Sequence, residues 1–350
     1  MPRPIDRTRI KKILVRSTNW VGDVVMSLPA LEAIGKNFPD AEIIVLARPW
    51  VTPLLKNHPA VHRVMSFVKG RGFTSDMFEI FKVSREIREQ GFDLAILFQN
   101  AIQAAIIAFL GGVRNRVGYN TDGRGFLLTH PIRRKSEVRK LHQIEYYLGI
   151  LRGMGWKAET RDPEIFLDPE DQRRAEKMLS SMGLGGEEFV LGLSPGAIYG
   201  PAKRWPAERF AAVADMAVEN WGARVLILGS KGEKDVCSRV KEHMKHEAVD
   251  LCGKTTLGEA MVLIKACDLF LTNDSGLMHV AAALGVPLVA IFGSTNPRAT
   301  GPRSQRARVV TRNVSCAPCL RKECPEDFRC MLDIEPDEVW ENMETLRWRL

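Results

Sequence analysis

Apolar and polar positions along this chain follow two spacings that alternate repeatedly. Short apolar runs, typical of buried strands, predict strands at residues 12–16, 41–47, 93–98 and 114–119, and again at 189–193, 224–228, 268–271 and 287–292. Helical spacing of apolar residues occurs at 24–38, 76–90, 142–151, 207–220, 233–246, 257–265 and 277–284. Pro29 lies inside the first helical pattern and should bend or shorten that helix. The alternation predicts an α/β fold, in which a parallel sheet carries helices on both faces.

The alternation occurs twice, with an interruption between the halves. Residues 155–170 carry Gly155, Pro163 and Pro169 among mixed charges and indicate a linker. A chain of 350 residues can also form two hydrophobic cores. We expect a Rossmann-like domain over residues 1–165, a second over 166–335, and a last helix over 336–350 that packs back on the first domain. Two such domains facing each other would leave a central cleft, where ligands often bind.

The charge balance indicates an acidic partner. The formal net charge is +8, which favours a nucleic acid, a phosphorylated lipid or a nucleotide-linked substrate. Charged residues make up 26% and hydrophobic residues 45%, as in ordinary soluble proteins. No apolar run has the length of a signal peptide or a membrane span, so we expect a cytoplasmic protein.

The cluster Asn273-Asp274-Ser275-Gly276 stands between a predicted strand and a predicted helix. Free N–H groups and the dipole at a helix start favour an anion, and ligands of parallel sheets bind where strands end. A helix cap alone would account for Asp274 or Ser275. His279, about one turn further on the same helix face, favours a binding site.

Other loops that follow predicted strands also carry candidate chemistry. Asp23 could accept a proton from a substrate hydroxyl, and Glu233 could accept hydrogen bonds from ribose hydroxyls. In the loop 194–206, Lys203 and Arg204 could hold a diphosphate. The alternatives are acids of a first helical turn for Asp23 and Glu233, and a solvated basic loop for the two cations. The chain contains neither a P-loop nor a G-x-G-x-x-G motif, which disfavours an ATPase or a dehydrogenase.

Four cysteines are clustered near the end of the chain, at Cys316, Cys319, Cys324 and Cys330. Clustered thiols suit a structural zinc ion or an iron–sulfur cluster, and a cytosolic location argues against disulfides. The alternative is a surface loop with free thiols. The spacing of the four cysteines is not that of a standard zinc finger, so it does not decide between a metal site and free thiols.

Taken together, three motifs resemble those of the bacterial ADP-heptose:lipopolysaccharide heptosyltransferases, glycosyltransferase family 9. They are Asn19–Asp23 with Met26-Ser27, Pro195–Ala197 with Lys203–Pro206, and Thr272–His279, and the resemblance extends over residues 12–310. It implies a GT-B fold and an inverting transfer without a catalytic metal or other cofactor. The implied donor is ADP-L-glycero-D-manno-heptose. The implied acceptor is the first heptose of the lipopolysaccharide inner core, carried on Kdo2-lipid A.

The resemblance also implies roles for individual residues. Asp23 matches the general base, and Lys203 matches the lysine that contacts the donor and its leaving diphosphate. Arg124 resembles an acceptor-side arginine, which Arg48 would assist. The implied donor-binding set is Ser194, Gly196, Lys203, Arg204, Glu233 (ribose), Thr255 (adenine), Asp274, Ser275, Gly276 and His279.

Two other functions stay open from the sequence. One is transfer from the same donor to a different acceptor, because acceptor choice depends on variable loops of the first domain. The other is a GT-B-like sugar-nucleotide-binding protein without catalysis, although the presence of both Asp23 and Lys203 argues against it. We expect no nucleic-acid partner. The basic run with Arg133, Arg134, Lys135, Arg139 and Lys140 is typical of a solvated face. The net charge of +8 nonetheless fits weak, salt-sensitive contact with the anionic inner face of the inner membrane.

Overall fold

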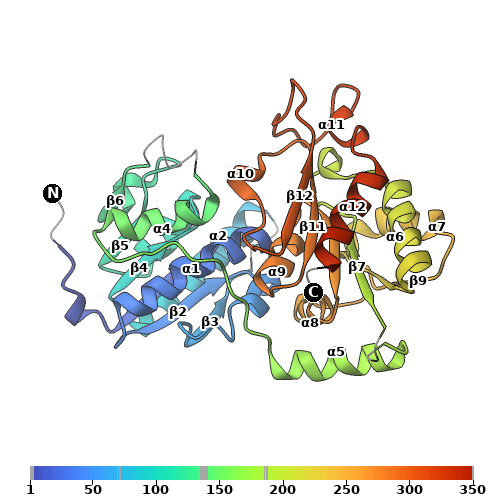
Figure 1. The fold of residues 1–350 in the computed structure, drawn as a ribbon. Helices are drawn as coiled ribbons and strands as arrows, with labels where there is room; N and C mark the ends of the chain where they lie inside the picture. The colour runs from blue at the N-terminus through green and yellow to red at the C-terminus, as the bar shows by residue number, and fades with distance from the viewer. Residues whose placement is uncertain are drawn as a thin grey trace. The chain divides into compact units, whose positions relative to one another are not determined.

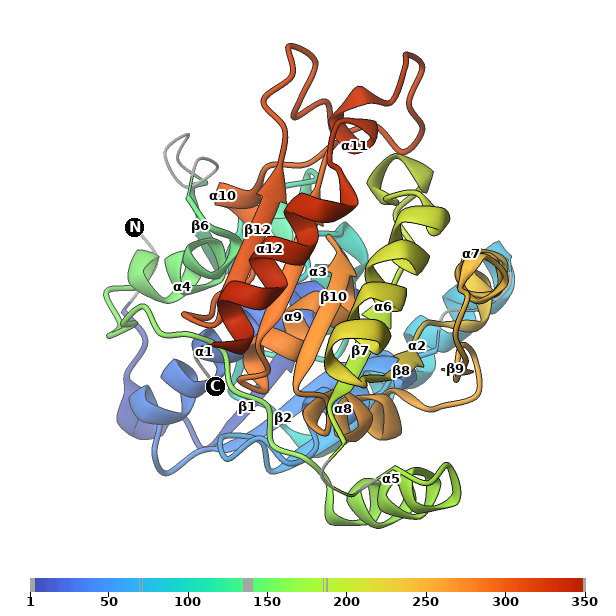
Figure 2. The ribbon, with the colours of Figure 1, turned by 45° about the vertical axis from the view of Figure 1, so that its right-hand side comes forward.

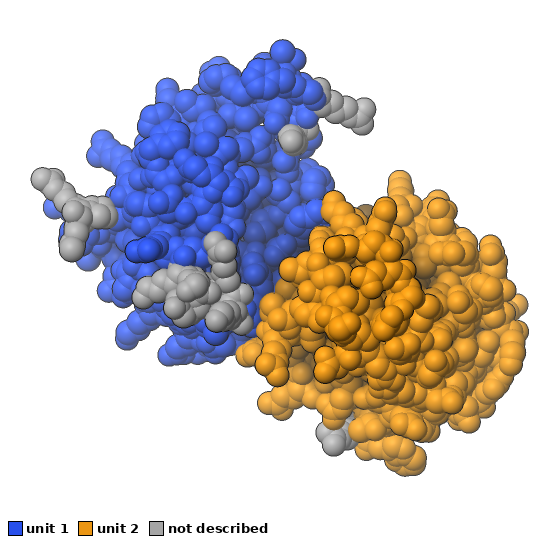
Figure 3. Space-filling view, turned by 90° about the horizontal axis from the view of Figure 1, so that it is seen from above, with its two compact units in different colours: residues 1–166 blue, residues 167–350 orange. Residues whose placement is uncertain are grey.

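The chain divides into two compact units, residues 1–166 and residues 167–350, which Figure 3 shows in different colours. The computed structural model describes residues 4–68, 70, 72–134, 141–184, 186 and 188–348. Lys135, Arg139 and Lys140 of the basic stretch lie outside these described residues. Among the described residues, none of the helices has the length and apolar character needed to cross a bilayer.

Unit 1 is built on a six-stranded parallel sheet with the order β3-β2-β1-β4-β5-β6 (Figure 1). Its strands are β1 (Lys12–Arg16), β2 (Glu42–Ala47), β3 (Arg63–Ser66), β4 (Leu94–Leu97), β5 (Asn115–Tyr119) and β6 (His130–Ile132). Its helices are α1 (Val21–Asn37), α2 (Phe73–Gln90), α3 (Ile102–Leu110) and α4 (Gln143–Gly153). The central strands are apolar almost throughout because helices cover both faces of the sheet.

The helices of unit 1 pack in two pairs. Helix α2 contacts α3, and the buried residues Ile80 and Val83 of α2 belong to one core cluster with Leu14 and Leu46 of the sheet. Helix α1 contacts α4. Pro29 does not shorten α1, which runs without interruption from Val21 to Asn37. Tertiary packing overrides the local cost of the proline, because its ring and the flanking Leu28 and Ala30 are buried.

Unit 2 repeats this architecture with the strand order β12-β11-β10-β7-β8-β9, again parallel throughout. Its strands are β7 (Val190–Ser194), β8 (Arg224–Ile227), β9 (Ala248–Asp250), β10 (Leu269–Asn273), β11 (Leu288–Phe292) and β12 (Ala307–Thr311). Its helices are α5 (Pro169–Ser181), α6 (Ala207–Trp221), α7 (Lys234–His243), α8 (Leu257–Lys265), α9 (Gly276–Ala283), α10 (Pro297–Thr300), α11 (Arg329–Leu332) and α12 (Pro336–Arg347). The α/β fold class predicted from the sequence is confirmed.

The last helix, α12, packs within unit 2, where Figure 2 shows it beside α6 and β11. The packing of this helix on the first domain stays a prediction. Its apolar face, Val339, Trp340, Met343 and Leu346, joins the core cluster of the second sheet. The Trp340 ring stacks on Trp221 of α6 at 4.4 Å between centroids. The apolar spacing along α12 indicates a helix that packs on a hydrophobic core, but it does not indicate which core.

We predict that Trp340→Ala destabilises unit 2 by about 3 kcal/mol, because truncating a buried aromatic side chain removes apolar contacts and leaves a cavity. Trp348→Ala is the matched control, because Trp348 caps the same helix but is 88% exposed, against 8% for Trp340. Urea unfolding followed by circular dichroism measures the difference. Equal losses in the two variants would contradict the placement of α12.

Candidate functional site

The loop after β7 is tied to the neighbouring strand β10 by one asparagine side chain. Asn273, the last residue of β10, donates from Nδ2 to the Pro195 carbonyl at 2.7 Å and accepts from the Trp205 N–H at 3.0 Å. The Trp205 ring is 1% exposed, and its Nε1 donates to the Ile334 carbonyl at 3.0 Å. Both ends of the loop are therefore fixed to the carboxyl edge of the sheet, so the loop has a defined shape.

Lys203 and Asp274 form a buried ion pair at this edge. Lys203 Nζ lies 2.5 Å from Asp274 Oδ2, and the same oxygen accepts from Thr295 Oγ1 at 2.6 Å. The side chains are only 14% and 5% exposed, and Nζ lies 4.9 Å from the centroid of the Tyr199 ring. Lys203 is therefore not a solvated surface lysine, and limited contact with water strengthens its attraction to an anion.

The start of α9 accounts for the other polar residues of the predicted cluster. Ser275 is the N-cap, and its Oγ accepts from the Met278 N–H at 3.4 Å. Gly276 is the first residue of the helix, and His279 lies on it with 5% exposure. The cap interpretation thus holds for Ser275, whereas Asp274 holds a cation instead.

Glu233 belongs to a turn that touches the loop after β7. Its Oε2 accepts from the N–H and the hydroxyl of Ser230 at 2.8 and 2.7 Å, which forms a capping box at the 3₁₀ segment Lys231–Glu233. A Cβ placed on Gly196 would lie 2.2 Å from Glu233 Oε1, so any side chain at this position would displace the Glu233 carboxylate. The structure thus brings Gly196 and Glu233 together at adjacent strand ends.

Three other residues of the predicted donor set are less closely connected to this arrangement. Arg204 donates from Nε and Nη2 to the Ala197 carbonyl, at 3.3 and 3.1 Å, and so braces its own loop. Thr255 lies between β9 and α8, next to Thr256, whose side chain caps α8. Ser194, the last residue of β7, is 2% exposed and pairs with Thr272 of β10.

In unit 1, Asp23 lies in the first turn of α1 and is held by a tyrosine far away in sequence. Tyr147 Oη of α4 donates to Asp23 Oδ1 at 3.0 Å. Burial first, and the Asp23 charge second, raise the pKa of Tyr147 well above its usual value, so the tyrosine stays a hydrogen-bond donor. The sequence analysis missed Tyr147, because helical spacing marks it only as a core residue of α4.

The two arginines predicted for the acceptor are buried in unit 1. Arg124 is 0% exposed, and it donates from Nε to the Tyr119 carbonyl at 2.9 Å and from Nη1 to the Gln99 carbonyl. Burial lowers its pKa to about 10. Arg48 is 4% exposed and donates from Nη1 to the Phe67 carbonyl at 3.0 Å. Both arginines brace the ends of strands, which fixes their positions more firmly than those of surface side chains.

The cysteine-rich segment packs against the loop that carries Lys203. The Tyr199 hydroxyl donates to the Leu320 carbonyl at 2.7 Å, and the Ala202 N–H donates to the Lys322 carbonyl at 3.0 Å. Its four thiols are free, and burial raises the pKa of Cys330 to about 11. Within the part of the chain that the structure describes, no group of three or more His, Cys, Asp or Glu side chains is arranged to hold a metal ion. A structural metal stays a prediction, which metal analysis of protein purified without affinity-tag metal tests.

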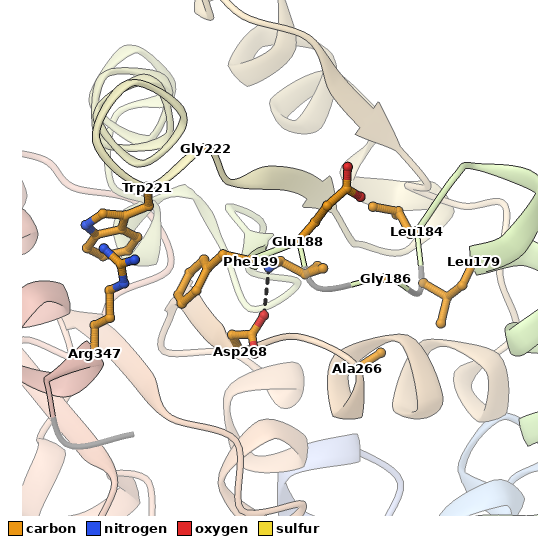
Figure 4. Close-up of a pocket in the computed structure, with 11 residues that line it drawn as sticks. Leu179, Leu184, Gly186, Glu188, Phe189, Trp221, Gly222, Ala266, Asp268 and Arg347 are labelled. Atoms are coloured by element: carbon orange, nitrogen blue, oxygen red, sulfur yellow. Dashed lines mark hydrogen bonds between the residues drawn. The ribbon is translucent and has the colours of Figure 1, made fainter.

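Figure 4 shows a surface pocket of about 490 Å³ at the opposite end of the second sheet. Phe189, Trp221, Asp268 and Arg347 contribute to its lining. Asp268 Oδ2 accepts from the Val190 N–H at 2.8 Å, which places the pocket at the amino end of β7. Since ligands of parallel sheets bind at the carboxyl ends, this pocket is not the candidate site.

The chain matches the model of glycosyltransferase family 9 (heptosyltransferase) over residues 80–328. It is 32% identical to lipopolysaccharide heptosyltransferase 2 of Escherichia coli (strain K12), over 96% of this chain and 98% of that protein. It is 31% identical to lipooligosaccharide heptosyltransferase 2 of Haemophilus influenzae, over 95% of this chain and 99% of that protein.

Solved structures agree with the sequence relatives. The structure of E. coli ADP-heptose LPS heptosyltransferase II has 28% identity and a TM-score of 0.83, covering 97% of this chain and 99% of that chain. A glycosyl transferase family 9 protein of Veillonella parvula has 25% identity and a TM-score of 0.86, covering 97% and 98%. The predicted family and the predicted GT-B fold are thus confirmed, and this chain belongs to glycosyltransferase family 9, the heptosyltransferases.

Proposed function

We propose that this heptosyltransferase transfers L-glycero-D-manno-heptose from ADP-heptose to the first heptose of the lipopolysaccharide inner core, with inversion and without a catalytic metal. The donor is supported by the E. coli protein of similar fold and 28% identity, which is described as an ADP-heptose LPS heptosyltransferase. The acceptor is supported by the relatives described as heptosyltransferase 2. The single observation that carries the proposal is the Lys203–Asp274 pair at the carboxyl edge of the second sheet.

The donor binds unit 2 in this proposal, where several groups suited to ADP lie at strand ends. Lys203 Nζ can turn from Asp274 to the diphosphate, exchanging one anion for another. The start of α9 adds the partial positive charge of a helix N-terminus. Glu233, already fixed through Ser230, keeps Oε1 for ribose hydroxyls. Charge that develops on the leaving ADP meets Lys203 and the helix start, which take the place of a metal ion.

The acceptor binds unit 1, and Asp23 is its general base. Tyr147 fixes one carboxylate oxygen of Asp23, and the carboxylate accepts the proton as the acceptor hydroxyl attacks the anomeric carbon. Attack opposite the ADP leaving group gives inversion. The reaction requires a conformation in which the hydroxyl at Asp23 meets the sugar held at Lys203, because proximity and alignment supply much of the rate.

The glycolipid acceptor places the reaction at the cytoplasmic face of the inner membrane. The formal net charge of +8 supports weak peripheral contact with anionic lipid there. Such contact weakens as salt rises, because exposed charges are screened.

The first prediction tests the donor and the acceptor together. With ADP-heptose as donor, heptosyl-Kdo2-lipid A should be glycosylated, whereas Kdo2-lipid A without the first heptose should not. Product detection by mass spectrometry, with and without excess EDTA, measures both. Preference for the acceptor that lacks heptose would indicate a different step of core assembly. Binding of ADP-heptose without any transfer would indicate a non-catalytic protein, and loss of activity in EDTA would contradict a metal-independent mechanism.

A second prediction concerns the base. Asp23→Asn should lower kcat by about two to four orders of magnitude, because general base catalysis contributes that much, while ADP affinity stays close to that of the wild type. Asp40→Asn is the control, an exposed aspartate of the same unit. Steady-state kinetics and calorimetric titration with ADP give the two quantities. Turnover of Asp23→Asn near the wild-type value would remove Asp23 from the mechanism.

A third prediction concerns the donor cation. Lys203→Ala should weaken ADP binding by about tenfold to a hundredfold and also lower kcat, because a charge-assisted hydrogen bond is lost. The exposed Lys241 of α7 gives the control variant Lys241→Ala. Because the substitution also leaves the buried Asp274 without its cation, thermal melting checks the fold, and Lys203→Arg tests rescue by a second cation. Unchanged kinetics in a folded Lys203→Ala protein would exclude Lys203 from the site.

A further inference from the structure

Unit 1 contains buried polar atoms that have no hydrogen-bond partner within the described residues. They are Arg16 Nε, Ser17 Oγ, Thr18 Oγ1, Arg48 Nε, Gln99 Oε1 and Arg124 Nη2. Folded proteins leave few such atoms, because a buried polar group without a partner has lost its water and gained nothing in return. A concentration of them therefore requires a physical explanation.

These atoms lie along one edge of the sheet. Arg16 is the last residue of β1, Arg48 directly follows β2, and Gln99 closely follows β4. Strands β2, β1 and β4 are neighbours and parallel, so their carboxyl ends share an edge (Figures 1 and 2). Arg124 reaches the same edge, because it bonds the carbonyls of Gln99 and of Tyr119 at the end of β5.

Within the described part of the chain, neither Arg16 nor Arg48 forms an ion pair with a carboxylate. Arg16 and Arg48 are 1% and 4% exposed, and their guanidinium carbons lie 5.6 and 4.6 Å from the centroid of the same ring, Phe67. Burial, and then the neighbouring charge of Arg48, lower the pKa of Arg16 to about 9. The carboxylate that favours the charge of Arg48 is Asp76, which accepts a hydrogen bond from Gln103 and forms no ion pair with Arg48 among the described residues.

Bracing of the strand ends explains only part of this arrangement. Arg16 Nη1 donates to the carbonyls of Ser17 and Leu46 at 2.9 and 3.0 Å, and Nη2 donates to Asn19 Oδ1. Carbonyl dipoles do not neutralise two adjacent buried cations, and such charges are normally paired. Lys203 of unit 2 differs from these two arginines, because it has Asp274 as its counter-ion.

The segment that leads into α1 supplies hydroxyl donors at this edge. Asp23 of the first turn accepts a hydrogen bond from Tyr147 Oη, and the N-cap, Trp20, makes no side-chain hydrogen bond to the helix. Ser17 and Thr18, which precede it, are 2% and 8% exposed and hold hydroxyls that can donate to an anion.

We propose that this edge is a binding site for an oxyanion, a phosphate monoester or a carboxylate, held by Arg16, Arg48 and the hydroxyls of Ser17 and Thr18. We call it the β1–β2 anion site. The anion supplies the missing counter-ion and the missing hydrogen-bond partners. Only the assignment of this anion to the acceptor glycolipid rests on the proposed function; the binding itself does not.

Calorimetric titration with inorganic phosphate, at constant ionic strength, tests the site. Saturating ADP is present in one series, so that phosphate sites that ADP occupies are filled. Wild-type protein should bind phosphate in both series, and Arg16→Met should weaken that binding about tenfold or more, because a charge-assisted contact is lost. Arg85→Met is the control, since Arg85 is an exposed arginine of the same unit that pairs with Glu89. Phosphate binding that ADP abolishes, or that Arg16→Met leaves unchanged, would overturn the proposal.

Thr18→Val keeps the test decisive if Arg16→Met does not fold. Because Thr18 Oγ1 has no partner among the described residues, its removal should leave the melting temperature of the phosphate-free protein unchanged or slightly raised. Phosphate affinity should nevertheless fall severalfold. A lower melting temperature with unchanged phosphate affinity would mean that the hydroxyl is structural and would contradict the site.

The transfer assay identifies the source of the anion. If the acceptor supplies it, inorganic phosphate should compete with the acceptor, and Thr18→Val should raise KM for the acceptor but not for ADP-heptose. Phosphate binding without competition would assign the site to free phosphate. Phosphate binding in a protein that transfers no heptose would refute the proposed function and leave the anion site intact, whereas transfer without phosphate binding would do the reverse.

Discussion

In a parallel sheet all strands end at the same edge, and the chemistry of both units depends on that constraint. Asp23 follows β1, Lys203 follows β7, and Asp274 follows β10. Residues that are separated by about seventy positions, such as Lys203 and Asp274, meet because β7 and β10 are neighbours in register. Asn273 then fixes the loop that carries Lys203, because its side chain bonds Pro195 at one end of that loop and Trp205 at the other. The strand order therefore brings Lys203 close to Asp274, and the buried side-chain amide of Asn273 fixes the position of the loop.

The two units differ in whether their buried cations have a carboxylate partner. In unit 2, Lys203 has a carboxylate partner, so the buried pair is close to neutral, and the proposed diphosphate would replace one anion by another. In unit 1, Arg16 and Arg48 lie beside the same Phe67 ring and have no ion-pair partner among the described residues, which is the basis of the proposed anion site. A protein with a formal net charge of +8 thus concentrates part of its excess charge where no solvent screens it.

The structure also gives the cysteine-rich segment a position. Its main chain bonds Tyr199 and Ala202, the residues that flank the turn leading to Lys203, and Leu320 N–H donates to the Ser294 carbonyl close to Thr295, a partner of Asp274. These contacts support the loop that carries Lys203. No local sequence signal predicts this contact, because the two loops are more than a hundred residues apart and neither has a periodic pattern.

The sequence by itself determined the alternation of strands and helices, because burial on both faces of a sheet requires apolar runs and a helix on a core requires an apolar stripe. It also predicted Asp23, Lys203 and Asp274 as candidate site residues, because each lies in a loop or helix start that comes after a strand. It missed short or edge elements such as β3 and β6, whose few residues carry little periodicity. Only the tertiary structure decided that Tyr147 holds Asp23, that α12 packs on α6, and that Arg16 is buried beside Arg48. Those contacts join segments that are distant in sequence. The local spacing of apolar residues does not show which distant segment a given side chain will contact.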